Sequence, residues 1–498
     1  MPSPSGYDPR VTSTSAPGAY KIHRAHIANL GCKVNQSEME AVAHLLRAGG
    51  VELVNDGSAE LVVVNTCTVT SMADRKSRQI VRRARRANPG AQVFVTGCSV
   101  VVDPDALAGA DPDARLFDND SKALLLAEIE KLVALPEGVA LPTLSGAEAA
   151  WGEDTGEETG GDEADAAAGA ADRTRAFVKI QDGCSFHCTY CIIPRARGPE
   201  RSVAPDRVLA SVREAIGGGH REIVLTGINA GTYRWPPASD VDGDEAATAA
   251  AGLGRTLDLP GVGRSLDLPG LIRRILAETP IERIRLSSIE PQHVTDDLLA
   301  VWRESGGRCL PHFHIPLQSG DDMVLRRMGR RYTTADYAAV VARVRDAVPG
   351  VAMHADLIAG FPAEDDDSWA RTMAFLRSLS LAGVHVFRYS GRPGTPAVRM
   401  VGQVDGRTKK RRAAEALALA AEARAAFAAA QLGRELRVLV EQPLAGGRPA
   451  RWLGHADNYV SVVVESAEPL VNRIASVVAR EIDPAVPDRI AGRVLSLD

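Results

Sequence analysis

Short apolar runs alternate with longer amphipathic stretches in the first part of the chain. Helical patterns of apolar positions cover residues 37–48 and 74–87, and the runs between them are too short for helices. These runs predict buried strands at 26–30 (HIANL), 61–65 (LVVVN) and 92–96 (QVFVT). Strands that alternate with helices favour a parallel, doubly wound sheet. We therefore predict an N-terminal α/β domain over residues 23–138.

A second series of strand and helix patterns fills residues 173–404. Its predicted strands are 176–180 (AFVKI), 222–225 (EIVL), 283–287 (RIRLS), 312–315 (HFHI), 353–358 (MHADLI) and 384–388 (VHVFR). Such a series predicts a full or partial parallel (βα)6 barrel, in which active sites lie at the carboxyl ends of the strands. Polar or glycine-rich segments follow these strands at LTGIN (225–229), SSIEP (287–291), PLQSG (316–320) and AGFPAE (359–364).

The last part of the chain predicts one helix and a small β domain. The alanine-rich helix covers 405–431 and opens with RTKKRR. Alternating apolar positions predict strands at 435–441, 459–465, 475–481 and 490–497. They favour a small OB-like β-barrel over 432–498, a type that often holds nucleic acid. The charge of this domain does not support a nucleic-acid partner, because the chain from Leu432 onward has eight Arg, no Lys and nine acids.

Charge is spread unevenly along the chain of 498 residues. The formal net charge is −5, but nine acids lie between Glu148 and Asp172 without any Lys or Arg, so the remainder is mildly basic. A mildly basic body is compatible with a polyanionic partner. We predict a disordered tail over 1–22, an acidic linker over 139–172 and a disordered-type insert near 236–268.

The sequence predicts a cytoplasmic protein without a membrane partner. Its first residues lack the apolar core of a signal peptide, and the most apolar long run, 413–430, is interrupted by charged residues. Seven cysteines without a secretory signal point to a reducing compartment. There, clustered cysteines bind metal or take part in chemistry more often than they form disulfides.

Three cysteines, Cys184, Cys188 and Cys191, form a C-x3-C-x2-C run just after the first predicted barrel strand, and we call them the core trio. Structural zinc sites have four protein ligands and commonly use C-x2-C pairs. The next cysteine, Cys309, is over a hundred residues away and is predicted to be a core thiol. An iron–sulfur cluster held by three thiolates leaves one iron open to a cofactor or substrate. The spacing therefore favours a cluster over zinc.

The core trio, with Tyr190 before its last cysteine, resembles the signature of the radical S-adenosylmethionine superfamily. Within that superfamily, the chain from about residue 25 to 400 resembles the methylthiotransferases, and its β domain resembles their TRAM module. The motifs that carry this resemblance are LGCKVNQSEME, VVNTCTVTSMADRKSRQIVRR, VTGCSV, IQDGCSFHCTYCIIPRARGPERS, LTGIN, RLSSIEP, HFHIPLQSGDDMVLRRMGRRY and DLIAGFPAED. GCKVNQ and NTCTVT favour the group acting on N6-threonylcarbamoyladenosine at tRNA position 37 over the isopentenyladenosine and ribosomal-protein branches. A noncatalytic iron–sulfur, RNA-binding protein is the alternative from another class.

The resemblance implies a reaction, two [4Fe-4S] clusters and S-adenosylmethionine. The cluster on the core trio would chelate the methionyl amine and carboxylate of one S-adenosylmethionine and cleave its sulfonium to a 5′-deoxyadenosyl radical. A second S-adenosylmethionine would methylate sulfur on the other cluster, and the radical would drive replacement of C2–H by C2–SCH3 on the adenine. The implied partners are the tRNA anticodon stem-loop, an electron donor of the reductase or flavodoxin type, and a sulfur donor.

A cysteine follows each predicted strand of the N-terminal domain within two residues: Cys32, Cys67 and Cys98, which we call the N-terminal trio. Ligands bind beyond the carboxyl ends of the strands in such sheets, so we expect these residues to converge on one edge. Buried structural thiols are the alternative, since free cysteine is among the most buried residue types. The family resemblance implies that the N-terminal trio holds the second cluster, whose open iron carries the sulfur.

A cofactor pocket is implied at the ends of the barrel strands. By resemblance, Gly227 passes near the methionyl group, Ser288 and Glu290 approach the ribose hydroxyls, and Gln318 and Tyr190 belong to the pocket wall. A carboxylate and a hydroxyl are good partners for a ribose diol, and glycine permits close backbone approach. Strand-end capping and turn chemistry are the alternatives for each residue.

Other polar residues leave their partners open. Arg195 and Arg197 flank the core trio and could contact the cofactor, a tRNA phosphate or only water. His312 and His314 are expected to pack or to line a pocket rather than to bind metal. Basic stretches that could contact RNA are DRKSRQIVRRARR (74–86), RRMGRR (326–331) and RTKKRR (407–412).

Overall fold

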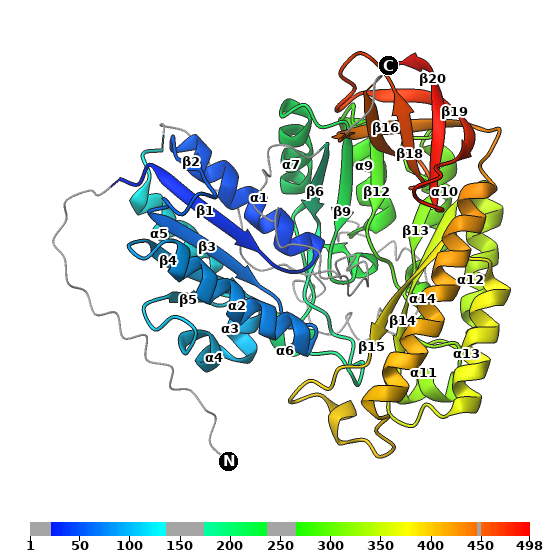
Figure 1. Ribbon diagram of the computed structural model, residues 1–498, viewed down its shortest axis with the longest axis horizontal. Helices are drawn as coiled ribbons and strands as arrows, with labels where there is room; N and C mark the ends of the chain where they lie inside the picture. The colour runs from blue at the N-terminus through cyan, green and yellow to red at the C-terminus, as the bar shows by residue number, and fades with distance from the viewer. Residues whose placement is uncertain (1–20, 136–173, 237–264, 446–449) are drawn as a thin grey trace, which may run out of the picture.

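The computed structural model describes residues 21–135, 174–236, 265–445 and 450–498. They form an N-terminal sheet domain, a central partial barrel and a C-terminal β-barrel, which follow one another in the colour gradient of Figure 1. The predicted tail at 1–22, the acidic linker at 139–172 and the insert near 236–268 lie wholly or mostly outside the described residues. None of the described helices is long and apolar enough to cross a membrane.

The N-terminal domain is a parallel sheet in the order β2-β1-β3-β4-β5. Its strands are β1 (Arg24–Asn29), β2 (Glu52–Leu53), β3 (Leu61–Thr66), β4 (Gln92–Gly97) and β5 (Arg115–Phe117). Its helices are α1 (Lys33–Ala48), α2 (Ser71–Ala87), α3 (Cys98–Val102), α4 (Pro104–Ala108) and α5 (Lys122–Leu132). Apolar residues of α1 and α5 cover one face of the sheet, and those of α2, α3 and α4 cover the other. The predicted doubly wound sheet is confirmed, with two short strands, β2 and β5, that the apolar pattern did not indicate.

The central domain contains all six predicted barrel strands. They are β6 (Arg175–Lys179), β9 (Glu222–Thr226), β12 (Arg283–Leu286), β13 (His312–His314), β14 (Ala352–Ala359) and β15 (Gly383–Arg388). The parallel sheets β6-β9-β12 and β13-β14-β15 are joined by the bridges Ile284–Cys309 and Ser288–His314. No pairing among the described strands closes β15 onto β6, so the barrel is partial.

Helices surround the partial barrel, and one core connects them to its strands. They are α6 (Ile193–Arg197), α7 (Pro205–Gly217), α9 (Leu268–Glu278), α10 (Asp296–Glu304), α11 (Asp322–Met328), α12 (Thr334–Ala347) and α13 (Asp366–Leu379). Short elements complete the domain: β7 (Gln181–Asp182), β8 (Arg201–Ser202), β10 (Arg234–Trp235), β11 (Leu266–Asp267) and the 3-10 turns at Ala230–Thr232, Pro291–His293 and Pro396–Arg399.

The C-terminal domain is a closed barrel in the order β16-β17-β18-β20-β19. Its strands are β16 (Glu435–Leu444), β17 (Arg451–Ala456), β18 (Ser461–Glu465), β19 (Ile474–Ile482) and β20 (Arg489–Leu497). The prediction of four strands missed β17, because Gly454 interrupts its alternating pattern of apolar residues. Glycine is required at this position, since a Cβ would lie 2.3 Å from the Leu439 carbonyl oxygen.

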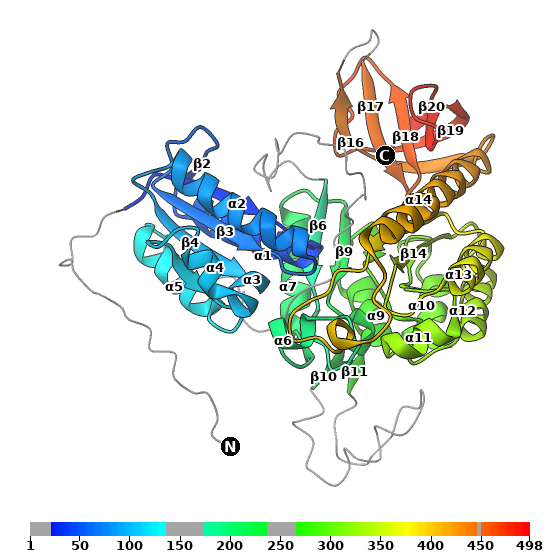
Figure 2. The same ribbon diagram turned by 60° about the horizontal axis from the view of Figure 1, so that its bottom comes forward.

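Helix α14 (Gly406–Ala429) joins the partial barrel to the closed barrel, as Figure 2 shows. Its alanines Ala413, Ala416 and Ala420 belong to the core of the central domain, and Ala428 belongs to the core of the closed barrel. Small side chains let one helix pack closely on both bodies, which explains its alanine-rich composition.

Candidate functional site

The N-terminal trio lies at the carboxyl edge of the N-terminal sheet. Cys32 and Cys67 follow β1 and β3, and Cys98 opens α3 directly after β4. All three side chains are buried. Gly31 has a φ of +118°, and a Cβ there would lie 3.0 Å from the Cys67 Cβ. The glycine therefore allows the loop after β1 to approach the loop after β3.

Burial suppresses ionisation of these thiols. It raises the pKa of Cys32, and it raises the pKa of Cys67 to about 12, with repulsion from the neighbouring thiolates as a further cause. The positive charge of Arg197 acts in the opposite direction on both cysteines. Thiolates at this edge thus require a positive group beside them, as a metal cluster or a buried cation would supply.

The core trio lies in the loop between β7 and α6. Gly183 begins this loop with a φ of +63°, and a Cβ there would lie 1.9 Å from the Pro199 carbonyl oxygen, so glycine is required. The Cys191 amide donates to the Cys188 carbonyl oxygen at 3.0 Å, which folds the two cysteines into one turn. Burial raises the pKa of Cys184 to about 11. The trio is partly exposed, in contrast to the buried N-terminal trio.

The spacing of the thiols argues against a single metal ion at either trio. Zinc at about 2.3 Å from each thiolate would bring tetrahedral sulfurs within about 3.8 Å of one another. Among the described residues, the group of His, Cys, Asp or Glu side chains that gathers three ligand atoms within 4.8 Å is formed by His314, Asp356 and His385. Neither described trio is among such groups, and three thiolates that leave one iron open are a ligand set of an iron–sulfur cluster.

Arg330 lies against the core trio. Its Nη1 donates to the Cys188 Sγ at 3.4 Å and its Nε donates to the Tyr332 hydroxyl at 3.0 Å. Its Nη2 pairs with Glu290, which places the predicted ribose ligand beside the core trio. The prediction that Arg330 of RRMGRR could contact RNA is wrong, because this residue is buried. A basic run gives no sign of which member turns inward.

The other predicted pocket residues lie at the strand ends in different settings. Gly227 follows β9, and a Cβ there would lie 2.9 Å from Gln181 Oε1, so the glycine admits the glutamine side chain. Gln181 Oε1 also accepts a hydrogen bond from the backbone amide of Asn229 at 2.9 Å. Sequence reasoning did not identify Gln181. Tyr190 is buried and packs edge-on against Phe361.

Ser288 and Gln318 are held by backbone contacts to β13 and β14. Ser288 forms a parallel β-bridge with His314. The backbone amide of Gln318 donates to the backbone carbonyl oxygen of Asp356 at 2.8 Å. Gln318 has a φ of +69°, which is uncommon for a residue with a side chain. Both residues are buried. The structure thus places both residues after the ends of β12 and β13.

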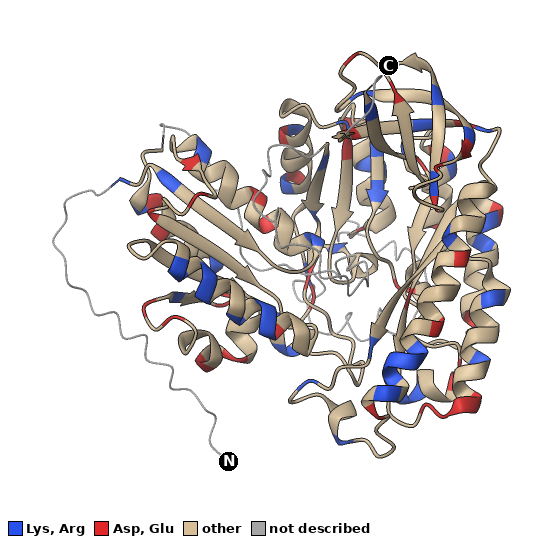
Figure 3. Cartoon of the chain, in the orientation of Figure 1, with Lys and Arg blue, Asp and Glu red and all other residues tan. Residues whose placement is uncertain are grey.

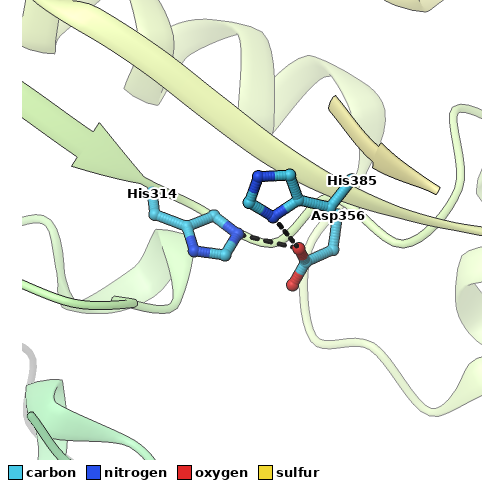
Figure 4. A group of neighbouring side chains, drawn as sticks. All are labelled: His314, Asp356 and His385. Atoms are coloured by element: carbon cyan, nitrogen blue, oxygen red, sulfur yellow. Dashed lines mark hydrogen bonds and ion pairs between the residues drawn. The ribbon is translucent and has the colours of Figure 1, made fainter. Parts of the chain in front are cut away.

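Their partners His314 and Asp356 form a buried polar group with His385, shown in Figure 4. His314 Nε2 donates to Asp356 Oδ1 at 2.8 Å, and His385 Nδ1 lies 3.5 Å from the same oxygen. Burial alone would raise the pKa of Asp356, but the two imidazoles hold it well below its usual range. The group ties β13, β14 and β15 together across the barrel. Its ligand atoms also have a spacing that a divalent ion accepts.

Two further residues that the sequence analysis named, His312 and Cys309, are buried. His312 is buried against His354 and Tyr459, with ring centroids 4.9 and 4.8 Å away. Cys309 is buried, and burial raises its pKa to about 12, as in a core thiol.

Arg195 and Arg197 have different environments, although both lie on α6. Arg195 is exposed, and its Nη1 lies 2.6 Å from where a Cβ on Gly394 would be. Arg197 is buried, its Nε donates to the Cys98 Sγ at 3.1 Å, and its Nη2 donates to Asn35 Oδ1 at 2.8 Å. The segment after the core trio therefore contributes a cation to the N-terminal trio.

A pocket lies between the N-terminal and central domains. Its lining is Val69, Thr70, Tyr190, Cys191, Ile192, Ile193, Ile358, Phe387, Arg388, Tyr389 and Ser390. The first two follow Cys67 of the N-terminal trio, and Cys191 belongs to the core trio. The Ser71 and Ser390 hydroxyls, 3.0 Å apart, join the domains next to this pocket. One mostly apolar pocket therefore touches the segments of both trios.

Two family models match different parts of the chain. Residues 178–376 match the radical SAM superfamily, and residues 24–117 match the uncharacterized protein family UPF0004. Radical SAM proteins use a [4Fe-4S] cluster and S-adenosylmethionine. Among solved structures, the radical S-adenosylmethionine methyltransferase TsrM from Kitasatospora setae aligns with a TM-score of 0.48 and 14% identity, covering 75% of this chain and 77% of that one.

Curated relatives match along most of the chain. The threonylcarbamoyladenosine tRNA methylthiotransferase MtaB of Bacillus subtilis is 33% identical, covering 90% of this chain and 92% of the relative. MtaB of Thermotoga maritima is 32% identical, covering 83% and 86%. The tRNA-2-methylthio-N(6)-dimethylallyladenosine synthase of Jannaschia is 30% identical, covering 99% and 98%. The chain therefore belongs to the radical S-adenosylmethionine methylthiotransferase family, and it is an enzyme of that class.

Proposed function

We propose that this enzyme converts N6-threonylcarbamoyladenosine at position 37 of tRNA to its 2-methylthio derivative. The observation that carries the proposal is the pocket between the domains, bordered by Cys191 on one side and by the segment after Cys67 on the other. A base in this pocket would lie between a radical-generating site and a sulfur-carrying site. The MtaB relatives support the substrate, and the dimethylallyladenosine synthases, at similar identity, make N6-isopentenyladenosine-37 the second candidate.

The proposal assigns a cluster to each cysteine trio. The cluster on the core trio, when bound, would supply the electron that cleaves S-adenosylmethionine, and the cluster on the N-terminal trio would supply the methylated sulfur. Gly227, Ser288, Glu290, Gln318 and Tyr190 are proposed to surround the cofactor. The electron comes from an external reductase or flavodoxin, the sulfur comes from a separate donor, and the reaction takes place in the cytoplasm.

The basic face of α2 is proposed as the tRNA contact. Helix α2 carries the exposed residues Arg75, Lys76, Arg82, Arg83 and Arg86, and its basic positions are blue along the helix in Figure 3. The helix begins next to Thr70, which lines the pocket. A cationic surface beside the pocket suits the phosphates that flank an anticodon-loop base.

The test uses anaerobically reconstituted protein with S-adenosylmethionine, reductant and sulfide. Two tRNA substrates, one with N6-threonylcarbamoyladenosine-37 and one with N6-isopentenyladenosine-37, are offered separately, and nucleosides are analysed by mass spectrometry. We expect the methylthio product from the first tRNA and about eight irons per chain. Product from the second tRNA alone would overturn the substrate, and no product from either would overturn the reaction on tRNA. Cys184→Ala is expected to abolish cleavage of S-adenosylmethionine, and Cys32→Ala is expected to retain cleavage but form no product.

A further inference from the structure

Arg197 connects the segment after the core trio to the N-terminal trio. It lies on α6, six residues after Cys191, yet its Nε donates to the Sγ of Cys98 at 3.1 Å. The Arg197 residue is 1% exposed, so water screens its charge little. Asn119 approaches the same region: its Nδ2 lies 3.9 Å from the Cys98 Sγ and donates to the Ala196 carbonyl oxygen at 2.7 Å.

Arg197 is a buried cation near the N-terminal trio, and Lys122 is another. Buried Lys122 forms an ion pair with Glu38, which supplies that lysine with a carboxylate partner. Arg197 donates to a thiol sulfur and to the Asn35 amide oxygen. Burial alone would lower the pKa of Arg197, but the Cys98 thiolate, ahead of Glu38 and Asp182, raises it. One donor of this buried arginine is therefore directed at a sulfur of the N-terminal trio.

We propose that Arg197 is a positioning residue of the cluster on the N-terminal trio and raises the reduction potential of that cluster. This inference rests on the proposed second cluster. Three thiolates bring negative charge to an iron–sulfur core, and reduction adds one more electron. A cation in hydrogen-bond contact with a ligand sulfur stabilises the reduced form more than the oxidised form. Low local polarity strengthens the effect, because the contact is buried.

The arrangement also couples the two sites. The loop that carries Cys184, Cys188 and Cys191 continues directly into α6, so movement of that loop moves a donor of the other cluster. Hydrogen bonds to cluster sulfurs are one of the means by which proteins set reduction potentials. The electronic properties of the sulfur-carrying site thus depend on a residue of the radical-generating domain.

The experiment isolates the N-terminal site in the full chain with Cys184→Ala, Cys188→Ala and Cys191→Ala as the parent protein. After anaerobic reconstitution with iron and sulfide, iron content is measured first. About four irons per chain establish the N-terminal cluster. No bound iron would overturn that cluster itself, separately from any role of Arg197. The cluster is then reduced with one electron by titrated dithionite, and electron paramagnetic resonance follows the reduced fraction.

In that parent, Arg197→Gln is expected to lower the ratio of reduced to oxidised cluster at least tenfold at a fixed potential, which is about 59 mV for a one-electron couple. Arg197→Lys retains the charge and is expected to stay near the parent potential. Arg195→Gln, an exposed position on the same helix, is the matched control and is expected to cause no shift.

Three results would overturn the proposal: a parent-like potential in Arg197→Gln, an equal shift in Arg195→Gln, or a shift in Arg197→Lys as large as in Arg197→Gln. If Arg197→Gln does not retain iron, the lysine variant decides. Iron retention with the parent potential in Arg197→Lys supports the charge role. Iron loss in both variants overturns it, because Arg197 would then be needed for structure rather than for charge.

Discussion

Glu290 is expected to stabilise the protein before any cofactor binds, because it neutralises buried Arg330. The Arg330 side chain is 3% exposed, and that of Glu290 is 17% exposed. Burial alone would lower the pKa of Arg330, and the Glu290 carboxylate is the main cause that raises it. Glu290→Gln keeps the shape of the side chain and removes its charge. The guanidinium would then be buried without this counter-charge, at an expected loss of about 3–5 kcal/mol in the free energy of unfolding.

A double-mutant cycle separates the ion pair from other effects. Arg330→Met is expected to cost about 1–3 kcal/mol, because the partly exposed Glu290 regains water. Combining Glu290→Gln with Arg330→Met removes both charges, so the double variant should be more stable than the two losses predict, by about 2 kcal/mol or more. The assay is anaerobic urea denaturation of the metal-free protein, followed by tryptophan fluorescence. Losses that add within about 0.5 kcal/mol would refute this account of the pair.

The same cycle tests the role of Glu290 toward the cofactor. A carboxylate that serves only a ribose hydroxyl leaves the stability of the metal-free protein within about 0.5 kcal/mol when it becomes an amide. It then changes the affinity for S-adenosylmethionine alone. A large loss of stability in the protein without cofactor would show that Glu290 mainly holds Arg330, which in turn contacts Cys188.

Other expected effects follow from single contacts. Gly227→Ala places a Cβ 3.1 Å from the backbone carbonyl oxygen of Gln181, which cannot rotate away. The free energy of unfolding should therefore fall by about 1–3 kcal/mol in urea denaturation, and a stability equal to that of the unmodified protein would contradict this expectation. Burial lowers the pKa of His293 to about 4, so the unfolded chain binds more protons between that value and about 6.5, and up to about 3 kcal/mol of stability is lost as pH falls through this window. His293→Gln should flatten this pH dependence, and an unchanged slope would count against it. Arg82→Glu with Arg86→Glu should weaken tRNA binding and reduce the slope of log affinity against log salt by about two, measured by fluorescence anisotropy. An equal effect of Arg207→Glu with Arg213→Glu, at two exposed positions on α7, would argue against a specific contact.

The fold was predictable wherever a strand is buried on both faces. The segment LVVVN is apolar and became β3, in which every residue is buried. Strands β2 and β5, with two and three residues, contain no such run, because an edge strand pairs on one side and needs few apolar positions. Strand β17 was missed at Gly454, where close packing against β16 excludes a side chain. At this position, close contact between neighbouring strands determines the residue, and the alternating pattern is lost.

The cysteines of the candidate site were predictable because their positions follow from local sequence and topology. Spacing identifies the core trio, and the ends of parallel strands bring the N-terminal trio to one edge. The residues around them were not predictable. Glu290 and Arg330 are 40 positions apart, and His314 meets Asp356 across 42. Such pairs depend on how strands and loops register in three dimensions, and no local pattern records that register.

Arg195 and Arg197 show what a sequence pattern can and cannot predict about two neighbouring side chains. Two positions along an α-helix turn by about 200°, so the pair must face nearly opposite directions. The pattern thus requires one arginine to turn inward if α6 packs against a neighbour, but it cannot select which one. Docking of the N-terminal domain makes the selection, through Asn35, Asn119 and Cys98. One of the contacts between the domains is therefore also a contact to a proposed cluster ligand, and a change that loosens the interface should alter the chemistry of that cluster even when every cysteine is intact.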